Sequence, residues 1–133
     1  MKKILMLTIL FILIIFSVCN AKDSDRWYWL TSTDTQTTFV DSYRINYNEQ
    51  YDVIECFLRI EIPSENRIEL IRTFFNYRNN TCTFYEGYVY DMNENLIDKI
   101  DNPTTNYIMP DTVGEEWAVY ISYLAGRTKS IDN

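Results

Sequence analysis

The sequence predicts an α+β fold: an antiparallel β-sheet meander that carries one C-terminal amphipathic helix packed on a face. Apolar and polar residues alternate with a period of two along much of residues 27–100, which is the pattern of half-buried strands. Short turns separate these segments, and strands joined by tight turns pair antiparallel. After residue 112 the apolar period becomes that of a helix. We therefore expect more β-strand than α-helix, with the helix covering one apolar face of the sheet.

Six strands are predicted along the chain. In order, they are residues 27–30, 37–40, 51–62, 67–77, 81–91 and 96–100. The third is the clearest, because five apolar side chains would share one face and charged side chains the other. The apolar five are Ile54, Cys56, Leu58, Ile60 and Ile62, and the charged three are Glu55, Arg59 and Glu61. In the fourth strand, one face would hold Ile68, Leu70 and Phe74, and the other Glu69, Ile71, Thr73 and Phe75.

The turn between the last two predicted strands is unusual. A two-residue hairpin centred on Asn93 and Glu94 requires positive φ at both residues, which Glu94 adopts at a cost of roughly 1 kcal/mol. The alternative is a longer loop with Asn95 in the left-handed conformation. Residues 91–95 also resemble the start of a calcium loop, but the glycine is missing and position twelve is Asn102. A hairpin turn is therefore favoured over a metal site.

The predicted helix has recognisable ends. Thr112 and Glu115 form a capping box at the start, and Gly126 stands where a helix commonly ends. Between them, apolar residues recur at helical spacing and would face the sheet. They are Val113, Trp117, Tyr120, Ile121 and Leu124.

The N-terminus predicts export. Lys2 and Lys3 precede an apolar run over residues 4–16, and a small-residue exit ends at Ala21. We therefore expect residues 1–21 to be a secretory signal peptide. The mature chain, residues 22–133, would be one domain with its core over about residues 26–125, located in the periplasm, at the cell surface or outside the cell.

Two other readings of the N-terminus remain: an uncleaved anchor, and a lipid-modified Cys19. Val18 argues against lipid modification, because bacterial lipoprotein signals place a small residue before the cysteine.

The mature chain is acidic. Loss of Lys2 and Lys3 takes the net charge from −7 to −9. Such an acidic chain is a poor candidate for nucleic acid or anionic lipid, and we expect no membrane span in the mature chain.

Cys56 and Cys82 are the cysteines that remain after cleavage. In an oxidising compartment an even pair predicts a disulfide, worth roughly 3–4 kcal/mol for a loop of this length in the chain-entropy model. Zinc is excluded, because two cysteines and no histidine supply too few ligands. We expect no cofactor and no metal site.

No catalytic group stands out. The absence of histidine excludes Ser-His-Asp and Cys-His arrangements. Glu115 and Glu116 are adjacent, but neighbouring helix residues point about 100° apart, so they do not form a glycosidase pair. Eleven tyrosines are too many to bury completely. Exposed tyrosine is common in protein-binding surfaces, and Tyr85, Tyr88 and Tyr90 are the predicted partner surface.

The mature chain resembles the bacterial surface-adhesin protein E family. The resemblance rests on short blocks in a fixed order, the last of which opens the helix. They are Trp27 with Trp29 and Leu30, residues 32–34, Phe39 and Asp41, residues 53–57, residues 90–93 before Leu96 and Ile97, and residues 110–115. The sequence departs from the family turn, Tyr-Asp-x-Asn-Gly, by having Glu94 in the glycine place. It also lacks a late cysteine that many members carry.

The resemblance implies an antiparallel sheet with a C-terminal helix, exposed at the cell envelope, in a family named for attachment to host matrix proteins. Together with export, the absence of catalytic groups and the surplus of tyrosine, it favours a non-enzymatic protein that binds a protein partner. One alternative is a periplasmic carrier that holds a small apolar ligand on an aromatic sheet face, and another is an exported enzyme that uses Asp or Glu alone. A flat, tyrosine-rich face opposite the helix would favour the protein partner, and a closed apolar pocket the ligand.

Overall fold

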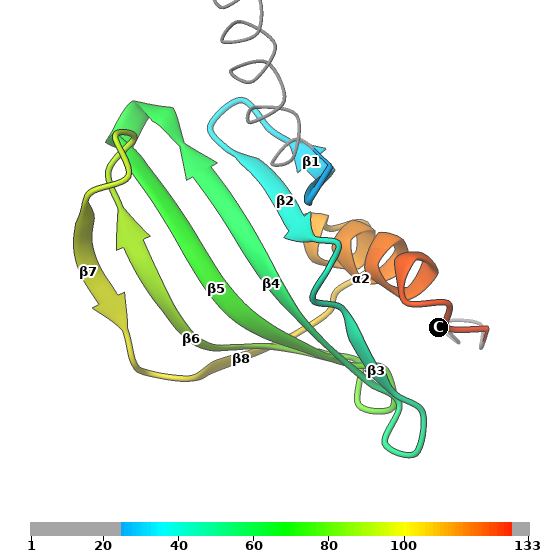
Figure 1. Cartoon of the computed structure of the whole chain (residues 1–133). Helices are drawn as coiled ribbons and strands as arrows, with labels where there is room; N and C mark the ends of the chain where they lie inside the picture. Colours follow the sequence, from blue (N-terminus) through cyan, green and yellow to red (C-terminus); the bar gives the residue numbers. More distant parts are fainter. Residues whose placement is uncertain (1–24, 129–133) are drawn as a thin grey trace, which may run out of the picture.

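The structure, a computed structural model, describes residues 25–128. They form an eight-stranded antiparallel sheet and one C-terminal helix, which confirms the predicted fold class (Figure 1). The strands are β1 (Trp27–Ser32), β2 (Thr37–Asp41), β3 (Asn46–Asn48), β4 (Val53–Ile62), β5 (Arg67–Asn76), β6 (Thr81–Tyr90), β7 (Leu96–Ile100) and β8 (Thr104–Tyr107). A single 3₁₀ turn, η1 (Pro63–Glu65), joins β4 to β5, and the helix is α2 (Val113–Leu124).

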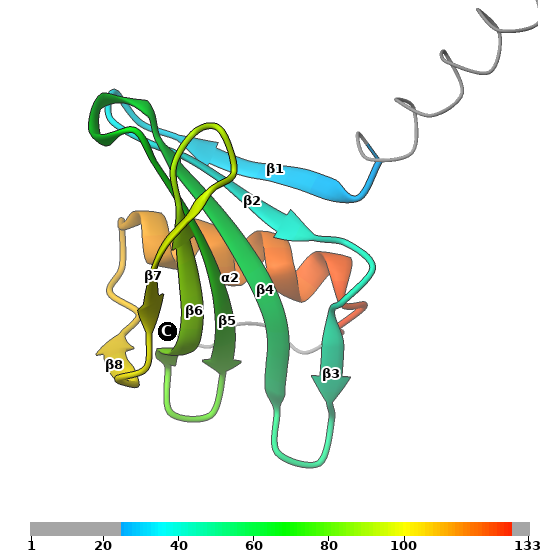
Figure 2. The same cartoon turned by 60° about the vertical axis from the view of Figure 1, so that its left-hand side comes forward.

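The sheet order is β1-β2-β4-β5-β6-β7, so the six predicted strands form the predicted meander. β3 and β8 were not predicted from the sequence, because they are short and lack an apolar alternation. They exist because β4 is longer than β2, and β6 is longer than β7. β2 pairs with the second half of β4 and leaves the first half to β3. In the same way, β7 pairs with the end of β6 and leaves its start to β8 (Figure 2).

The core lies between the sheet and α2. The alternation predicted for β4 is confirmed: Ile54, Cys56, Leu58 and Ile60 are buried. The two predicted sets of β5 also separate. Ile71 and Phe75 join this core, whereas Ile68, Leu70 and Phe74 belong to the opposite face.

Helix α2 covers one face of the sheet through a narrow stripe. Trp117, Ala118 and Ile121 are buried, and the Trp117 Nε1–H donates a hydrogen bond to Thr31 Oγ1 over 2.8 Å. Tyr120 was predicted to face the sheet and does not; its side chain is 44% exposed. The small side chain of Ala118 takes part in the contact, and the buried stripe is rotated away from Tyr120 accordingly.

The predicted ends of the helix are confirmed. Thr112 is the N-cap, and its Oγ1 accepts a hydrogen bond from the Glu115 backbone N–H. The Glu115 carboxylate in turn accepts from the backbone N–H of Asp111, one residue earlier than in the usual capping box. Gly126 has φ of +69° just beyond the last turn, a conformation that glycine adopts without strain.

The predicted disulfide between Cys56 and Cys82 is wrong. Both thiols are free and buried, on β4 and β6, and β5 runs between these strands. Cys56 pairs with Thr73 and Cys82 with Phe75, so the two cysteines are two strand spacings apart across the sheet and two residues apart along it, roughly 11–12 Å in all. A disulfide needs Cα atoms within about 7 Å. Both cysteines face the core, but they are not on neighbouring strands.

A buried ion pair connects the segment just after α2 to the β3–β4 turn. Arg127 Nε and Nη2 donate to the two carboxylate oxygens of Asp52 over 2.8 and 2.9 Å. The hydroxyl of Tyr47 donates to the same carboxylate over 2.9 Å, and the guanidinium lies 4.2 Å from the ring centroid of Tyr77. Segments 75 residues apart in the chain are thereby joined.

The predicted signal peptide and Cys19 lie outside the described residues. Within residues 25–128, the structure contains no helix with the length and apolar character needed to cross a membrane.

Candidate functional site

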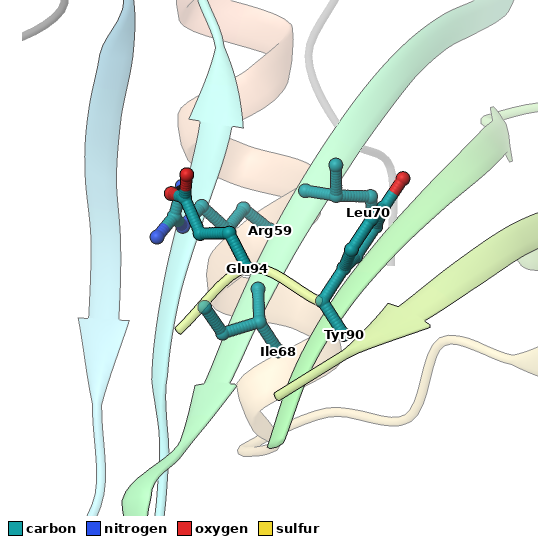
Figure 3. A pocket seen from close by; sticks show the side chains of 5 residues that line it. All are labelled: Arg59, Ile68, Leu70, Tyr90 and Glu94. Carbon is teal, nitrogen blue, oxygen red and sulfur yellow. Dashed lines mark ion pairs between the residues drawn. The ribbon is translucent and has the colours of Figure 1, made fainter. Parts of the chain in front are cut away.

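The candidate site is the sheet face that α2 does not cover, which we call the open face. Figure 3 views this face with α2 behind the sheet. The register of the strands places one side chain from each of six strands in a row across it. The row runs Trp29, Phe39, Arg59, Leu70, Tyr88 and Lys99. Aromatic and charged side chains therefore share this face, in contrast to the apolar face under the helix.

The predicted tyrosines of β6 meet on the open face because of a β-bulge. Strict alternation would place Tyr85 on the opposite side from Tyr88 and Tyr90. The pairing of β5 with β6 shifts register at this point, where Arg72 pairs with Glu86 and Tyr85 is the extra residue. A bulge turns the extra side chain toward the face of its neighbour. All three predicted residues therefore lie on one face.

The bulged tyrosine is held by neighbours on β5. The rings of Tyr85 and Phe74 pack edge to face, with centroids 5.8 Å apart. The guanidinium of Arg72 lies 5.7 Å from the Tyr85 centroid and 5.2 Å from that of Phe74. Tyr85 and Tyr88 are nevertheless 46% and 44% exposed, and only Tyr90 is half-buried. The Tyr85 ring is thus held by its neighbours, and the rings of both Tyr85 and Tyr88 are open to a partner.

Arg72 also organises the charges of this region. Its Nε donates to Glu55 over 2.6 Å, and its Nη1 to Glu86 over 3.3 Å. These three residues come from β5, β4 and β6, so one guanidinium joins three strands. The hydrogen bond to Glu55 is the main cause of a raised pKa of Arg72. The charge on this arginine is therefore permanent, and two carboxylates share it.

A depression of about 240 Å³ lies at the end of the open face near the β6–β7 turn (Figure 3). Its lining comes from Arg59, Ile68, Leu70, Tyr90 and Glu94. A second depression, of about 250 Å³, lies near the β3–β4 turn. It is lined by Asn46, Asn48, Tyr51, Val53, Glu55 and Phe74. Both are smaller than the roughly 300–1,000 Å³ of typical small-molecule pockets, and neither lining is purely apolar.

Glu94 reaches the first depression from a strained turn. Its φ is +65°, as predicted, but the turn is a three-residue loop and the predicted two-residue hairpin is wrong. The Asp91 N–H donates to the Asn95 carbonyl, and the Glu94 N–H to the Asp91 carbonyl, both over 2.9 Å. In such a loop only the third residue, Glu94, is left-handed. Asn95 does not take that conformation.

The Asp91 carboxylate is used inside this turn. One oxygen accepts from the backbone N–H groups of Asn93 and Asn95, and the other from the Asn95 side-chain amide. The bonds from Asn95 are the main cause of the lowered pKa of Asp91. Among residues 25–128, no three side chains of metal-ligating type come together. The hairpin reading of this segment is the one that the geometry supports.

Sequence reasoning missed several residues of the open face. Arg59, Arg72 and Glu94 were not predicted as site residues, although the alternation of the third predicted strand did place Arg59 away from the core. For Arg72 and Glu94 the sequence carries a weaker signal, because the contacts of both residues depend on which strands become neighbours.

Comparison of the chain with protein-family models, with curated proteins and with solved structures finds no match.

Proposed function

We propose that this chain is an exported, non-enzymatic protein of the cell envelope or cell surface that binds a protein partner through its open face. The observation that carries the proposal is the pair of exposed rings, Tyr85 and Tyr88, on a face braced by arginine–glutamate pairs. Tyrosine and arginine are enriched where proteins bind proteins, since each offers both apolar contact and hydrogen bonds.

The bracing supports binding at low entropic cost. Tyr85 rests against Phe74 and Arg72, so little side-chain freedom is lost when a partner covers it. Strands also fix the positions of these rings better than a loop would. A partner with a complementary surface could therefore bind this face with little loss of side-chain entropy.

The shape of the face favours a protein partner over the alternative, a carrier of a small apolar ligand. Both depressions are open to solvent on a broad sheet face, and each has charged or amide side chains in its lining. An apolar ligand would leave those polar groups unpaired, which carries a free-energy cost. A protein partner would meet them with its own polar rim.

Export and membership of the surface-adhesin protein E family belong to the proposal too. The signal-peptide pattern of residues 1–21 supports export, and the ordered blocks of the sequence support the family. Fractionation of the producing cells, followed by protease treatment of intact cells, would locate the protein. Recovery of the full-length chain, uncleaved, in the cytosol would contradict export.

Site-specific photo-crosslinking tests the partner surface. A photoreactive phenylalanine analogue placed at Tyr88 should give a discrete crosslinked adduct in intact cells. The matched control is Tyr123 on α2, which is 80% exposed but lies away from the open face. Adducts from position 123 alone, or equally from both positions, would contradict the proposal. A crosslink at Tyr88 to a small molecule only would favour the carrier.

A second measurement uses affinity once an adduct is identified. Tyr88→Ala should weaken binding about 30-fold or more if Tyr88 is a hot spot, since such truncations cost about 2 kcal/mol or more. Tyr123→Ala should leave binding unchanged. Because both side chains are exposed, neither change is expected to unfold the domain.

A further inference from the structure

We propose that the depression beside Glu94 is an anchor site for an arginine side chain of the protein partner. The inference rests on the proposed function, and it names the chemistry that this part of the open face selects. The volume of about 240 Å³ suits one side chain of a partner better than a free ligand of drug size.

The floor of the depression is apolar. Ile68 and Leu70 come from β5, and Tyr90 lies directly across from Ile68 on β6. Ile68 is only 3% exposed, so the floor is well packed and does not collapse further. The methylene stem of a long side chain would bury apolar area here, and a flat guanidinium would stack on the Tyr90 ring.

The rim is acidic. Arg59 is the cation in the lining, and its Nε is bonded to Glu61 over 2.7 Å. Glu61 pairs across the strands with Ile68, so this carboxylate lies next to the depression. Glu94 supplies a second carboxylate, which is 3.8 Å from Arg59 Nη1 and 74% exposed. Two carboxylates against one guanidinium leave a net charge of about −1.

The sign of this charge decides the occupant. An incoming carboxylate would face Glu61 and Glu94 and would have to displace one of them from Arg59. An incoming guanidinium would find the exposed Glu94 carboxylate, which Arg59 holds only at long range. Arginine is preferred over lysine because its planar group binds a carboxylate with two hydrogen bonds and also stacks on a ring. The acidic balance of the whole chain acts in the same direction.

Peptide titrations test the anchor site. The ¹⁵N-labelled exported protein is titrated with the probe acetyl-Ala-Ala-Arg-Ala-Ala-amide and with the same peptide containing citrulline, which has the shape of arginine but no charge. The arginine peptide should shift the backbone amide signals of Ile68, Leu70, Tyr90 and Glu94 and bind more tightly than the citrulline peptide. The difference should shrink as salt is added.

Variants separate charge from fold. Glu94→Gln should weaken the arginine peptide about two- to fivefold, as expected for an exposed ion pair, and leave the citrulline peptide unchanged. Glu94→Gly should weaken it equally, although it relaxes the turn. The matched control is Glu65→Gln in η1, an exposed carboxylate outside the lining, which should change nothing.

The outcomes distinguish this inference from the proposed function. Equal binding of the arginine and citrulline peptides, or an effect of Glu65→Gln as large as that of Glu94→Gln, would overturn the arginine site. Tighter binding of a peptide with glutamate at the central position would also overturn it. None of these results would remove a crosslink at Tyr88, so the partner surface would stand without its anchor.

Discussion

The ion pair between Arg127 and Asp52 should contribute more stability than any other single polar contact described above. Their side chains are 3% and 8% exposed, so neither charge is solvated by bulk water. Arg127→Ala would leave the Asp52 carboxylate buried with a hydroxyl donor from Tyr47 and without this guanidinium. Removing one partner of a buried pair costs about 3–5 kcal/mol. The lost stacking on Tyr77 adds about 0.5–2 kcal/mol.

Such a loss is large against the 5–15 kcal/mol that stabilises a typical domain. Urea unfolding followed by tryptophan fluorescence would measure it, since Trp117 lies in the core beneath the helix. The control is the double variant Asp52→Asn with Arg127→Met, which removes both charges and keeps a long side chain. Asparagine also suits the φ of +56° at position 52. The double variant should recover much of the lost stability.

A cost of Arg127→Ala below about 1 kcal/mol, the value expected of a solvated surface pair, would contradict a stabilising buried pair. A double variant no more stable than Arg127→Ala would contradict it as well. In that case the loss would come from packing around Tyr77, and removal of the positive charge beside Asp52 would not be its cause.

Three further predictions concern other parts of the fold. Trp117→Ala should destabilise the domain by about 3–5 kcal/mol in urea melts, because a buried ring and its bond to Thr31 are lost; a cost under 1 kcal/mol would contradict the packing. Glu94→Gly should stabilise it by up to about 1 kcal/mol, as glycine adopts the left-handed conformation freely, and clear destabilisation would count against this turn. Burial raises the pKa of Cys82 to about 12 and also raises that of Cys56. As pH rises above about 9, the thiols therefore lose their protons in the unfolded chain before they do so in the folded one. The free energy of unfolding should then fall by about 1.4 kcal/mol per pH unit for each thiol, until the pH passes the pKa of the folded state. Melts at pH 8 and about 9.5 with reductant, below the range in which unfolded tyrosine ionises, should show this slope, and the double Cys→Ala variant should lose it.

Patterns within a short stretch of sequence predicted the features that depend only on that stretch, such as strand faces and helix ends. The faces of β4 follow from its alternation, and the helix ends follow from Thr112 and Gly126. Features that depend on neighbouring strands were not predictable in this way. The bulge at Tyr85 reverses the alternation of β6 at one residue, and nothing in the sequence marks that position. The sequence therefore predicts the tyrosines as a set from their number, and the bulge that brings them to one face is visible only in the structure.

The prediction of a Cys56–Cys82 disulfide is wrong for the same reason, because the distance between the cysteines depends on which strands are neighbours. Spacing along the chain gives the cost of closing a loop, but strand order decides whether the loop closes. Here β5 separates the strands that carry Cys56 and Cys82. The two thiols are 0% and 6% exposed, so in the folded domain little oxidant reaches them. A bridge between them would have to form before β5 takes its place, and it would then exclude the native sheet. The folded domain therefore gains its stability from core packing and the Arg127–Asp52 pair, and in an oxidising compartment a Cys56–Cys82 bridge would compete with its folding.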